Sequence, residues 1–512
     1  MSGTTIAARG ARGVRAAQST AVWLMPSGLM LLLGAWGIRR REAIWRDEAA
    51  TYDMAHRGLA DLWATLQHVD VVHGAYYALM HVWFRLYDAT LDGDFGAAIG
   101  LRLPSVAAMT AAAAGVALLG RRLAGRRAGL FAGLTFAVIP LMQQYAQEGR
   151  SYAIVCALVV WAGYLLVRAA ARPRRRLWLG YTALMLFACL LHEFACLALP
   201  AHGAAVVFAR LPRRVRRAWA LCAAAVLAGL APLAVYSTRQ SAQISWLMWP
   251  DPVQLLTFAV LAALGLACAR VRALPRREVP PSGPISLRDL AVPLLLLPTL
   301  LLLLLSHLQP AYVDRYVLYY VAGFALLAGA ALARLLRPAG EQGQTRTRRL
   351  RRVAAVALVL AALLPVDVHL RSPDSRVDDV TAVAQAVRKV AEPGDGLLFM
   401  PSRRRIWMAT RPHDFRGLRD LALAESPSTS RTLYGTELSG DEVRGRMLAS
   451  RRIVVAGDPA GQPADNSDEE IAKRATLRSA FVVCGTTEVR GARVTLYARA
   501  GGGTEGGDAG DC

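Results

Sequence analysis

The chain has 512 residues, 54% of them hydrophobic, and a mean hydropathy of +0.32. The apolar residues come in long runs rather than at the spacing of an amphipathic helix, which excludes an ordinary soluble domain. The formal net charge is +23, but the arginines mark alternate loops instead of forming one patch, which argues against a nucleic-acid partner.

Eleven apolar runs predict an α-helical polytopic membrane protein, because each is close to the roughly 20 residues that cross a bilayer. They lie near 20–37, 102–120, 128–144, 152–170, 177–192, 194–210, 218–236, 253–269, 290–308, 315–335 and 352–367. A basic segment, 1–19, precedes the first run, and no A-x-A-like cleavage site follows that run. We therefore expect an uncleaved first span rather than a removed signal peptide.

The arginine clusters predict the topology. With these spans, the basic N-terminus and five later clusters fall on one side, which the positive-inside rule makes the cytoplasm. The clusters lie in 121–127, 172–176, 213–217, 270–277 and 346–352. The N-terminus is then cytoplasmic, and the odd number of spans places the chain after residue 367 outside. Arg39-Arg40-Arg41 are an exception on the outer side, for which a re-entrant or interfacial position and contact with an anionic ligand are the alternatives.

The C-terminal part, 368–500, has a different texture. Valines at helical spacing predict a helix over 377–391, and short apolar runs at 396–400, 452–455 and 481–484 predict strands of a small extracytoplasmic α/β domain. The glycine-rich and acidic tail, 501–512, is expected to be disordered. Five of the seven cysteines lie in or beside apolar runs, so only Cys484 and Cys512 are placed for a disulfide outside.

Polar residues interrupt the transmembrane part, 20–367, only on the outer face, which suggests a shared site there. The first outer loop, 38–101, carries Arg46-Asp47-Glu48-Ala49 just beyond the first span. The other polar or aromatic groups expected on this face are Asp70, His73, Tyr76, Glu148, Arg150, Tyr152, His192, Glu193, Trp246, Asp314, Arg315 and Tyr316.

These motifs resemble the lipid-linked-sugar-dependent transferases of the protein O-mannosyltransferase and aminoarabinose transferase type, glycosyltransferase family 39 with the GT-C fold. The resemblance rests on residues 46–49, on 145–152, and on Pro310 with Arg315-Tyr316, and it covers about residues 20–370 in order. The chain departs from the family at His73-Gly74-Ala75-Tyr76-Tyr77, where a stiff Pro-Pro turn is missing.

The resemblance implies a multi-pass glycosyltransferase of the plasma membrane with about eleven transmembrane helices. Its first outer loop would fold into short interfacial helices over the site. It would move a mannose- or pentose-type sugar from a decaprenyl- or undecaprenyl-phosphate donor to an extracytoplasmic glycan, lipid or protein acceptor of the cell envelope.

The chemistry of such a transfer assigns roles to residues. A base must take the acceptor's proton, and cations must stabilise the leaving phosphate. Asp47 is the candidate base, with Glu48 orienting the acceptor or a metal ion. Arg150 and Arg315 suit the phosphate, because a guanidinium stays charged and binds two oxygens, and His192 or His73 would assist.

Single-displacement attack predicts inversion at the sugar carbon. The other residues predicted to bind substrate are Asp70, His73, Tyr76, Tyr152, Glu193, Trp246 and Tyr316. No cofactor is assigned, and a divalent metal ion stays open because no ligand cluster is specific enough to identify one.

Each assignment has a simpler alternative. Asp47-Glu48 could be the acidic N-cap and first turn of a helix over 48–57. Arg150 and Arg315 could snorkel or pair with Glu148 and Asp314, and His192-Glu193 could be a polar helix end.

At the level of the whole protein, a lipid-linked-sugar flippase or transporter would bind a head group without chemistry. The chain lacks the paired Gly/Pro-interrupted helices typical of many transporters. An extracytoplasmic sensor or scaffold would account for 368–500 but leaves the first outer loop unexplained.

Overall fold

The computed structural model describes residues 20–240, 250–271, 283–308, 310–336 and 346–500. The chain forms two compact units, and each is made of segments that are far apart in the sequence. One unit contains residues 1–38 and 102–370, and the other contains 39–101 and 371–512. The first outer loop thus belongs to the same unit as the C-terminal part of the chain.

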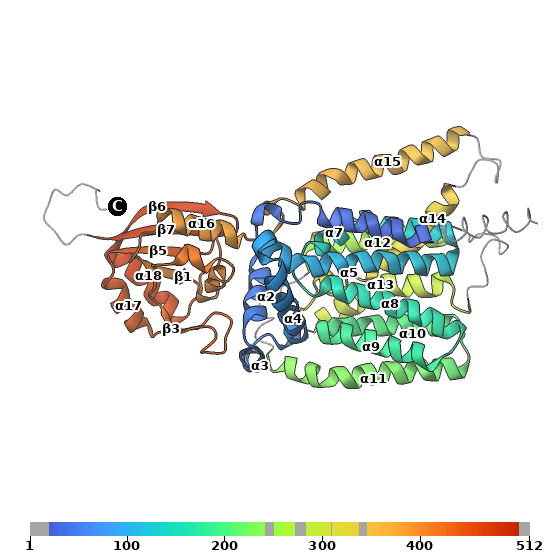
Figure 1. Ribbon diagram of the computed structural model, residues 1–512, viewed down its shortest axis with the longest axis horizontal. Coiled ribbons are helices and arrows are strands. Elements are labelled where there is room, and N and C mark those ends of the chain that lie inside the picture. Colours follow the sequence, from blue (N-terminus) through green and yellow to red (C-terminus); the bar gives the residue numbers. More distant parts are fainter. Residues whose placement is uncertain (1–19, 241–249, 272–282, 309, 337–345, 501–512) are drawn as a thin grey trace, which may run out of the picture. The chain divides into compact units, whose positions relative to one another are not determined.

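The membrane unit is a bundle of long helices (Figure 1). Two helices belong to it only in part: Thr20–Glu42 up to residue 38, and α5 (Asp92–Ala124) from residue 102 onward. The others, in chain order, are α6 (Arg126–Val138), α7 (Pro140–Ala146), α8 (Tyr152–Ala171), α9 (Arg175–Leu191), α10 (Ala198–Phe208), α11 (Arg213–Thr238), α12 (Pro252–Arg270), α13 (Leu287–Ser306), α14 (Tyr320–Leu335) and α15 (Arg346–His369). Among the described residues, seven helices are long and apolar enough to cross a membrane, or eight if the bent pair α6–α7 is one span.

Large apolar side chains cover the outside of this bundle. Leu221 on α11 and Leu358 on α15 are each 72% exposed, and Leu256 on α12 is 64% exposed. In water such a surface would drive aggregation, whereas in a bilayer the acyl chains solvate it. The fold class predicted from the sequence, a polytopic helical membrane protein with a C-terminal α/β domain, is confirmed.

Glycines bring helices of the bundle into close contact. A Cβ on Gly129 of α6 would lie 2.4 Å from the carbonyl oxygen of Ala117 on α5, and one on Gly329 of α14 would lie 2.3 Å from the backbone nitrogen of Ala132 on α6. Small residues at such points let two backbones approach each other, as is typical of packed membrane helices.

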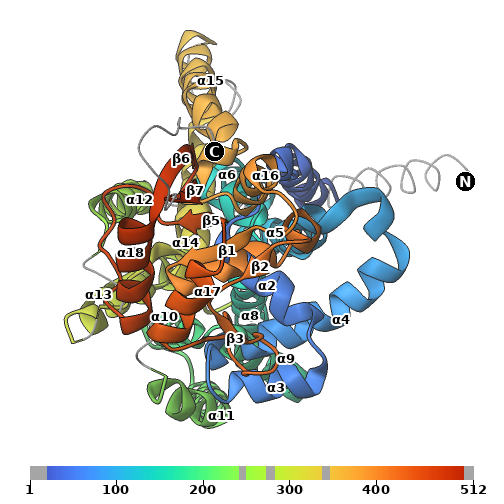
Figure 2. The ribbon, with the colours of Figure 1, turned by 90° about the vertical axis from the view of Figure 1, so that its left-hand side faces the viewer.

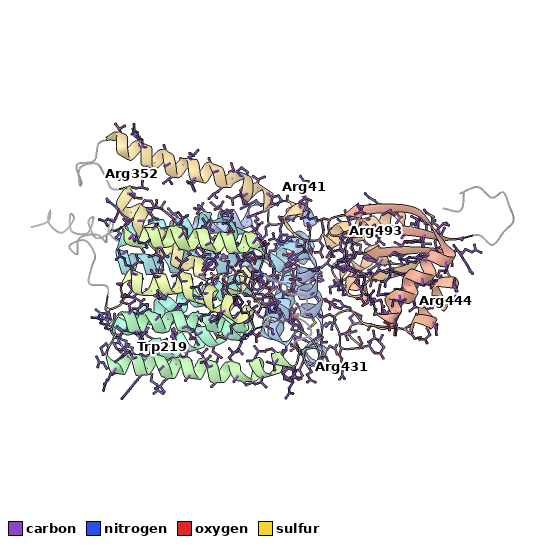
Figure 3. All side chains as sticks on the ribbon, turned by 180° about the vertical axis from the view of Figure 1, so that it is seen from behind. Arg41, Trp219, Arg352, Arg431, Arg444 and Arg493 are labelled. Carbon is purple, nitrogen blue, oxygen red and sulfur yellow. The ribbon has the colours of Figure 1, made fainter. Side chains whose placement is uncertain are left out.

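Basic residues gather at one end of the bundle. Arg352, at the start of α15, and Trp219, which follows the arginines 213–217 on α11, lie at the same end in Figure 3. This arrangement agrees with the clustering expected from the positive-inside rule.

The second unit begins with the first outer loop, which is helical. It contains the short 3₁₀ turn η1 (Arg40–Glu42), α2 (Arg46–His56), α3 (Leu59–Leu66), the 3₁₀ turn η2 (Val71–His73) and α4 (Gly74–Thr90). The predicted helix over 48–57 corresponds to α2, which begins two residues earlier.

The α/β part of this unit is built on a five-stranded sheet of order β2-β1-β5-β7-β6. Its strands are β1 (Gly396–Met400), β2 (Arg419–Asp420), β5 (Arg452–Gly457), β6 (Phe481–Val489) and β7 (Ala492–Arg499), and a separate pair contains β3 (Leu423–Glu425) and β4 (Thr436–Glu437). Strand β1 is parallel to β2 and β5, whereas β7 is antiparallel to β5 and β6.

Helices cover both faces of this sheet (Figure 2). Leu398 of β1 and Ile453 of β5 pack in one core with residues of α17 (Gly440–Leu448) and α18 (Asp468–Ala480). Alternate residues such as Leu397 and Val454 are buried on the other face, where α16 (Val380–Val390) contacts the sheet. Cys484, on β6, is disulfide-bonded, while Cys512 lies outside the described residues.

Candidate active site

Helix α2 presents the acid pair Asp47-Glu48 in its first turn. The side chain of Asp47 is 27% exposed, and its Oδ1 lies 3.9 Å from Nε of Arg46. Glu48 is fully buried, and its Oε1 lies 3.6 Å from the buried guanidinium of Arg40. Of the two carboxylates, Asp47 is therefore the one that a substrate can reach.

This geometry bears on two of the alternatives raised by the sequence. The N-cap of α2 is Trp45, not Asp47, so the proposed N-cap role of Asp47 is wrong, although both acids remain in the first turn. Arg40 adopts a left-handed backbone conformation with φ of 44°. Its guanidinium pairs with Glu48, so an internal ion pair accounts for this member of the outer-side arginine run.

A second carboxylate of the first outer loop is held by two neighbours. Oδ1 of Asp70 lies 2.6 Å from Nδ1 of His73, and the hydroxyl of Tyr77 donates to Oδ2 of Asp70. The backbone of Asp70 has a left-handed conformation, with φ of 60°, so Asp70 is not part of a helix and lies just before the turn η2. Tyr76, a predicted substrate contact, and Tyr77 are both fully buried, and the tyrosine that contacts Asp70 is Tyr77.

Tyr434, in the α/β part of the unit, is electrostatically coupled to both acids. Burial raises the pKa of its hydroxyl, and the carboxylates of Asp70 and Asp47 raise that pKa further. The hydrogen bond from the Arg405 guanidinium to the carbonyl oxygen of Tyr434, 2.8 Å long, fixes its backbone. No local motif marks this residue, and only the folded chain shows that it approaches the first outer loop.

Aromatic rings surround Arg315 in the membrane unit. Its guanidinium carbon lies 5.5 Å from the ring centre of Tyr152 and 5.8 Å from that of Tyr316, and its Nε donates to the Tyr152 hydroxyl over 3.2 Å. The ring of His192 is 4.5 Å from Tyr316 and 5.6 Å from Tyr152. Four of the predicted site residues, Tyr152, His192, Arg315 and Tyr316, are thus brought together.

The turn between α7 and α8 supplies the next group. Glu148 and Arg150 are 2% and 6% exposed, and the Ser105 hydroxyl of α5 donates to the carbonyl oxygen of Glu148 over 2.6 Å. Nearby, the hydroxyl of Tyr145 donates to Asp314 over 3.1 Å. Burial raises the pKa of Asp314, and Arg315 and the Tyr145 hydroxyl oppose that rise.

The other predicted residues are His192, already placed beside Arg315, with its neighbour Glu193, and Trp246. His192 follows the last residue of α9 as its C-cap, and Glu193 begins a 3₁₀ turn, so the pair does lie at a helix end. Glu193 accepts a hydrogen bond from the Ser237 hydroxyl over 2.9 Å. Trp246 lies outside the described residues. Within the part of the chain that the structure describes, no group of three or more His, Cys, Asp or Glu residues is arranged to hold a metal ion.

The long apolar helices and the α/β part define a multi-pass membrane protein with an additional α/β part. Residues 77–236 match the sequence family described as dolichyl-phosphate-mannose-protein mannosyltransferase. The comparison with curated proteins gives no significant match.

Two of the solved structures with a similar fold are of the same protein. ArnT from Cupriavidus metallidurans bound to undecaprenyl phosphate matches with a TM-score of 0.55 and 13% identity, over 92% of this chain and 97% of that one. The same protein in its apo state matches with a TM-score of 0.51 and 12% identity, over 96% and 98% of the two chains. The resemblance to GT-C glycosyltransferases that the motifs predict is therefore confirmed at the level of the fold.

Proposed function

We propose that the protein is a membrane glycosyltransferase that moves a sugar from a polyprenyl-phosphate donor to an extracytoplasmic acceptor. The observation that carries this proposal is the partly exposed carboxylate of Asp47 beside the buried Arg40–Glu48 pair. The matched family, named for a dolichyl-phosphate-mannose transferase, and the undecaprenyl phosphate bound to the similar ArnT support a lipid-phosphate donor.

In the proposed reaction, Asp47 removes the proton from an acceptor hydroxyl as its oxygen attacks the anomeric carbon of the sugar. The bond from that carbon to the phosphate oxygen breaks, and polyprenyl phosphate leaves with both bonding electrons. Attack from the face opposite the leaving group inverts the anomeric configuration. Glu48 acts by fixing Arg40 and the first turn of α2, which holds the Asp47 carboxylate in place.

Arg315 is proposed to bind the donor phosphate, with Arg150 and His192 assisting. The rings of Tyr152 and Tyr316 flank the guanidinium and hold it in one orientation, which reduces the entropy lost on binding. Asp70, His73 and Tyr77 form a hydrogen-bonded group suited to an acceptor hydroxyl. Glu193 and Tyr316 stay in the proposal as contacts to the donor.

The proposed topology follows from the charge pattern. The N-terminus is cytoplasmic, and the active site and residues 368–500 lie outside the cytoplasm of a plasma membrane. A mannose- or pentose-type sugar and an acceptor from the cell envelope complete the proposal.

The test is sugar transfer by the purified full-length chain in lipid, with a panel of radiolabelled polyprenyl-phosphate sugars and crude envelope acceptors. Asp47→Asn removes the base but keeps the side chain's size, so transfer should fall by about 10²–10⁴-fold while donor binding persists. Asp61→Asn is the matched control, because Asp61 is an exposed acid in the first turn of the neighbouring helix α3. It should transfer at the wild-type rate.

Two outcomes would contradict the proposal. Full transfer by Asp47→Asn would place the base elsewhere. Binding of donors without transfer or hydrolysis of any sugar by the wild type would instead support a flippase or transporter. Product stereochemistry provides a separate check, because a retained anomeric configuration is incompatible with a single displacement.

A further inference from the structure

The N-terminus of α2 receives its cap from a residue far away in the sequence. The first backbone N–H groups of any helix have no partner within the helix, and a side-chain oxygen normally accepts from them. Trp45, at the N-cap position of α2, has only an indole N–H and makes no such bond. Instead, Oδ1 of Asp378 accepts the backbone N–H of Arg46 over 3.0 Å, across 332 residues of sequence.

Two further hydrogen bonds hold the segment that leads into α2. The backbone N–H of Val380 donates to the carbonyl oxygen of Ile44 over 2.7 Å. The hydroxyl of Thr381 donates to the backbone carbonyl oxygen of Glu42 over 2.8 Å. Asp378, Val380 and Thr381 together are called the clamp. The clamp includes the first two residues of α16 and bonds to Glu42, Ile44 and Arg46, so it fixes both the position and the direction of the first turn of α2.

The α/β sheet holds the clamp in turn. Nη1 of Arg404 lies 3.9 Å from Oδ2 of Asp378, and the same guanidinium forms an ion pair with Asp458, which follows β5. Arg404 is also held over the ring of Trp407, 5.1 Å from its centroid. At the β6–β7 turn, Gly491 fits so closely against the clamp that a Cβ there would lie 2.5 Å from Cβ of Asp378.

We infer that Asp378 is a positioning residue for Asp47, and that the clamp makes the C-terminal α/β part a component of the active site. Asp378 acts through the first turn of α2 and does not touch the substrate. The inference rests on the proposed function and deepens it. The part that concerns structure, that the clamp holds the first turn of α2, depends only on the hydrogen bonds.

The test uses full-length protein carrying Asp378→Ala, which removes the cap, and Asp378→Asn, which keeps an acceptor oxygen. The first should lower kcat for sugar transfer by about tenfold, as expected from the loss of a cap, with the KM for the donor unchanged. The second should restore kcat to within about twofold of wild type. Ser439→Ala is the control, because it removes the capping box of α17 in the same unit without contacting α2.

A second variant displaces the clamp without changing its chemistry. Gly491 has φ of 72°, and a Cβ there would collide with the clamp, so Gly491→Ala should lower kcat as Asp378→Ala does. Gly461→Ala is its control, because Gly461 has φ of 84° with open space around the position of a Cβ. It carries the same kind of backbone strain and should keep the wild-type kcat.

Hydrogen exchange gives a readout that does not depend on activity. In Asp378→Ala, the amides of residues 46–49 should exchange about tenfold faster than in wild type, whereas those of α4 should not change. If the wild type transfers no sugar but exchange at 46–49 rises as stated, the clamp is confirmed and the proposed function fails. Unchanged exchange, or a kcat loss in Asp378→Asn as large as in Asp378→Ala, would overturn the inference.

Discussion

The Arg315 guanidinium shows how a membrane-unit cation can be held ready for an anion. It lies against two tyrosine rings and donates to one of their hydroxyls. The guanidinium carbon lies within 6 Å of both ring centres, a distance at which a cation is attracted to an aromatic face. The compact ammonium of lysine lacks the planar, fork-like set of donors. The cost of ordering a long side chain is thus met before a ligand arrives.

Replacing Arg315 by lysine should therefore weaken binding of polyprenyl phosphate by tenfold or more, because the fork of donors and the hydrogen bond to the Tyr152 hydroxyl are lost. Tyr152→Phe keeps the ring and removes only the hydroxyl, so binding should weaken by about fivefold, the equivalent of one ordinary hydrogen bond. Both values come from equilibrium binding of the lipid phosphate to the purified protein.

Arg239→Lys is the matched control for Arg315→Lys. Arg239 lies 5.7 Å from the ring centre of Tyr236, a similar contact outside the cluster. Its replacement should not change the affinity. Equal losses in the two arginine variants would mean that the ring contacts of Arg315 have no special role in binding phosphate.

Some of these residues can be found from the sequence alone, and others cannot. Asp47 and Arg315 stand in local motifs beside apolar runs, so their order along the chain was enough to select them. Tyr434 and Asp378 stand in no such motif. Asp378 accepts a hydrogen bond from the backbone of Arg46, and the carboxylates of Asp70 and Asp47 raise the pKa of Tyr434. Such relations between distant segments cannot be seen in a linear sequence.

At the scale of elements, the periodic patterns were the most reliable. The predicted strand over 396–400 is β1, and the predicted helix over 377–391 contains α16. All eleven apolar runs fall on helices, but the runs near 194–210 and 315–335 give short helices, Glu193–Phe208 and Tyr320–Leu335. The break at Pro140, which bends α6 against α7 by 66°, follows from the missing N–H of proline.

Close contact between α6 and α14 depends on a residue without a side chain. In Gly329→Ala, the added methyl group would lie 2.3 Å from a backbone nitrogen of α6, which cannot yield as a flexible side chain would. We expect the two helices to separate, with a loss of about 1–3 kcal/mol in stability and a lower midpoint in a thermal melt of the protein in detergent.

Gly28→Ala serves as the comparison for Gly329→Ala, because a Cβ at Gly28 has nothing within 4 Å. Its melting midpoint should match or exceed that of the wild type, since alanine favours a helix over glycine. A normal midpoint for Gly329→Ala would show that the bundle relaxes around the contact without a measurable cost.

For the whole molecule, the charge pattern predicts the orientation in the membrane. A phosphatase that is active only outside the cytoplasm should be active when fused after residue 500 and inactive when fused within 172–176. A fluorescent protein that folds only in the cytoplasm should give the reverse result. Phosphatase activity at both sites would contradict the predicted topology.

The clamp also sets an order of events during synthesis. Residue 46 leaves the ribosome 332 residues before its partner at 378, a delay of roughly 15–70 s at typical elongation rates of about 5–20 residues per second. During that time the helix bearing Asp47 has no cap, and the bundle inserts without it. If Asp47 is the base, as proposed, we expect it to be positioned only when the last part of the chain arrives, so that a chain truncated before residue 378 would keep its membrane helices but transfer no sugar.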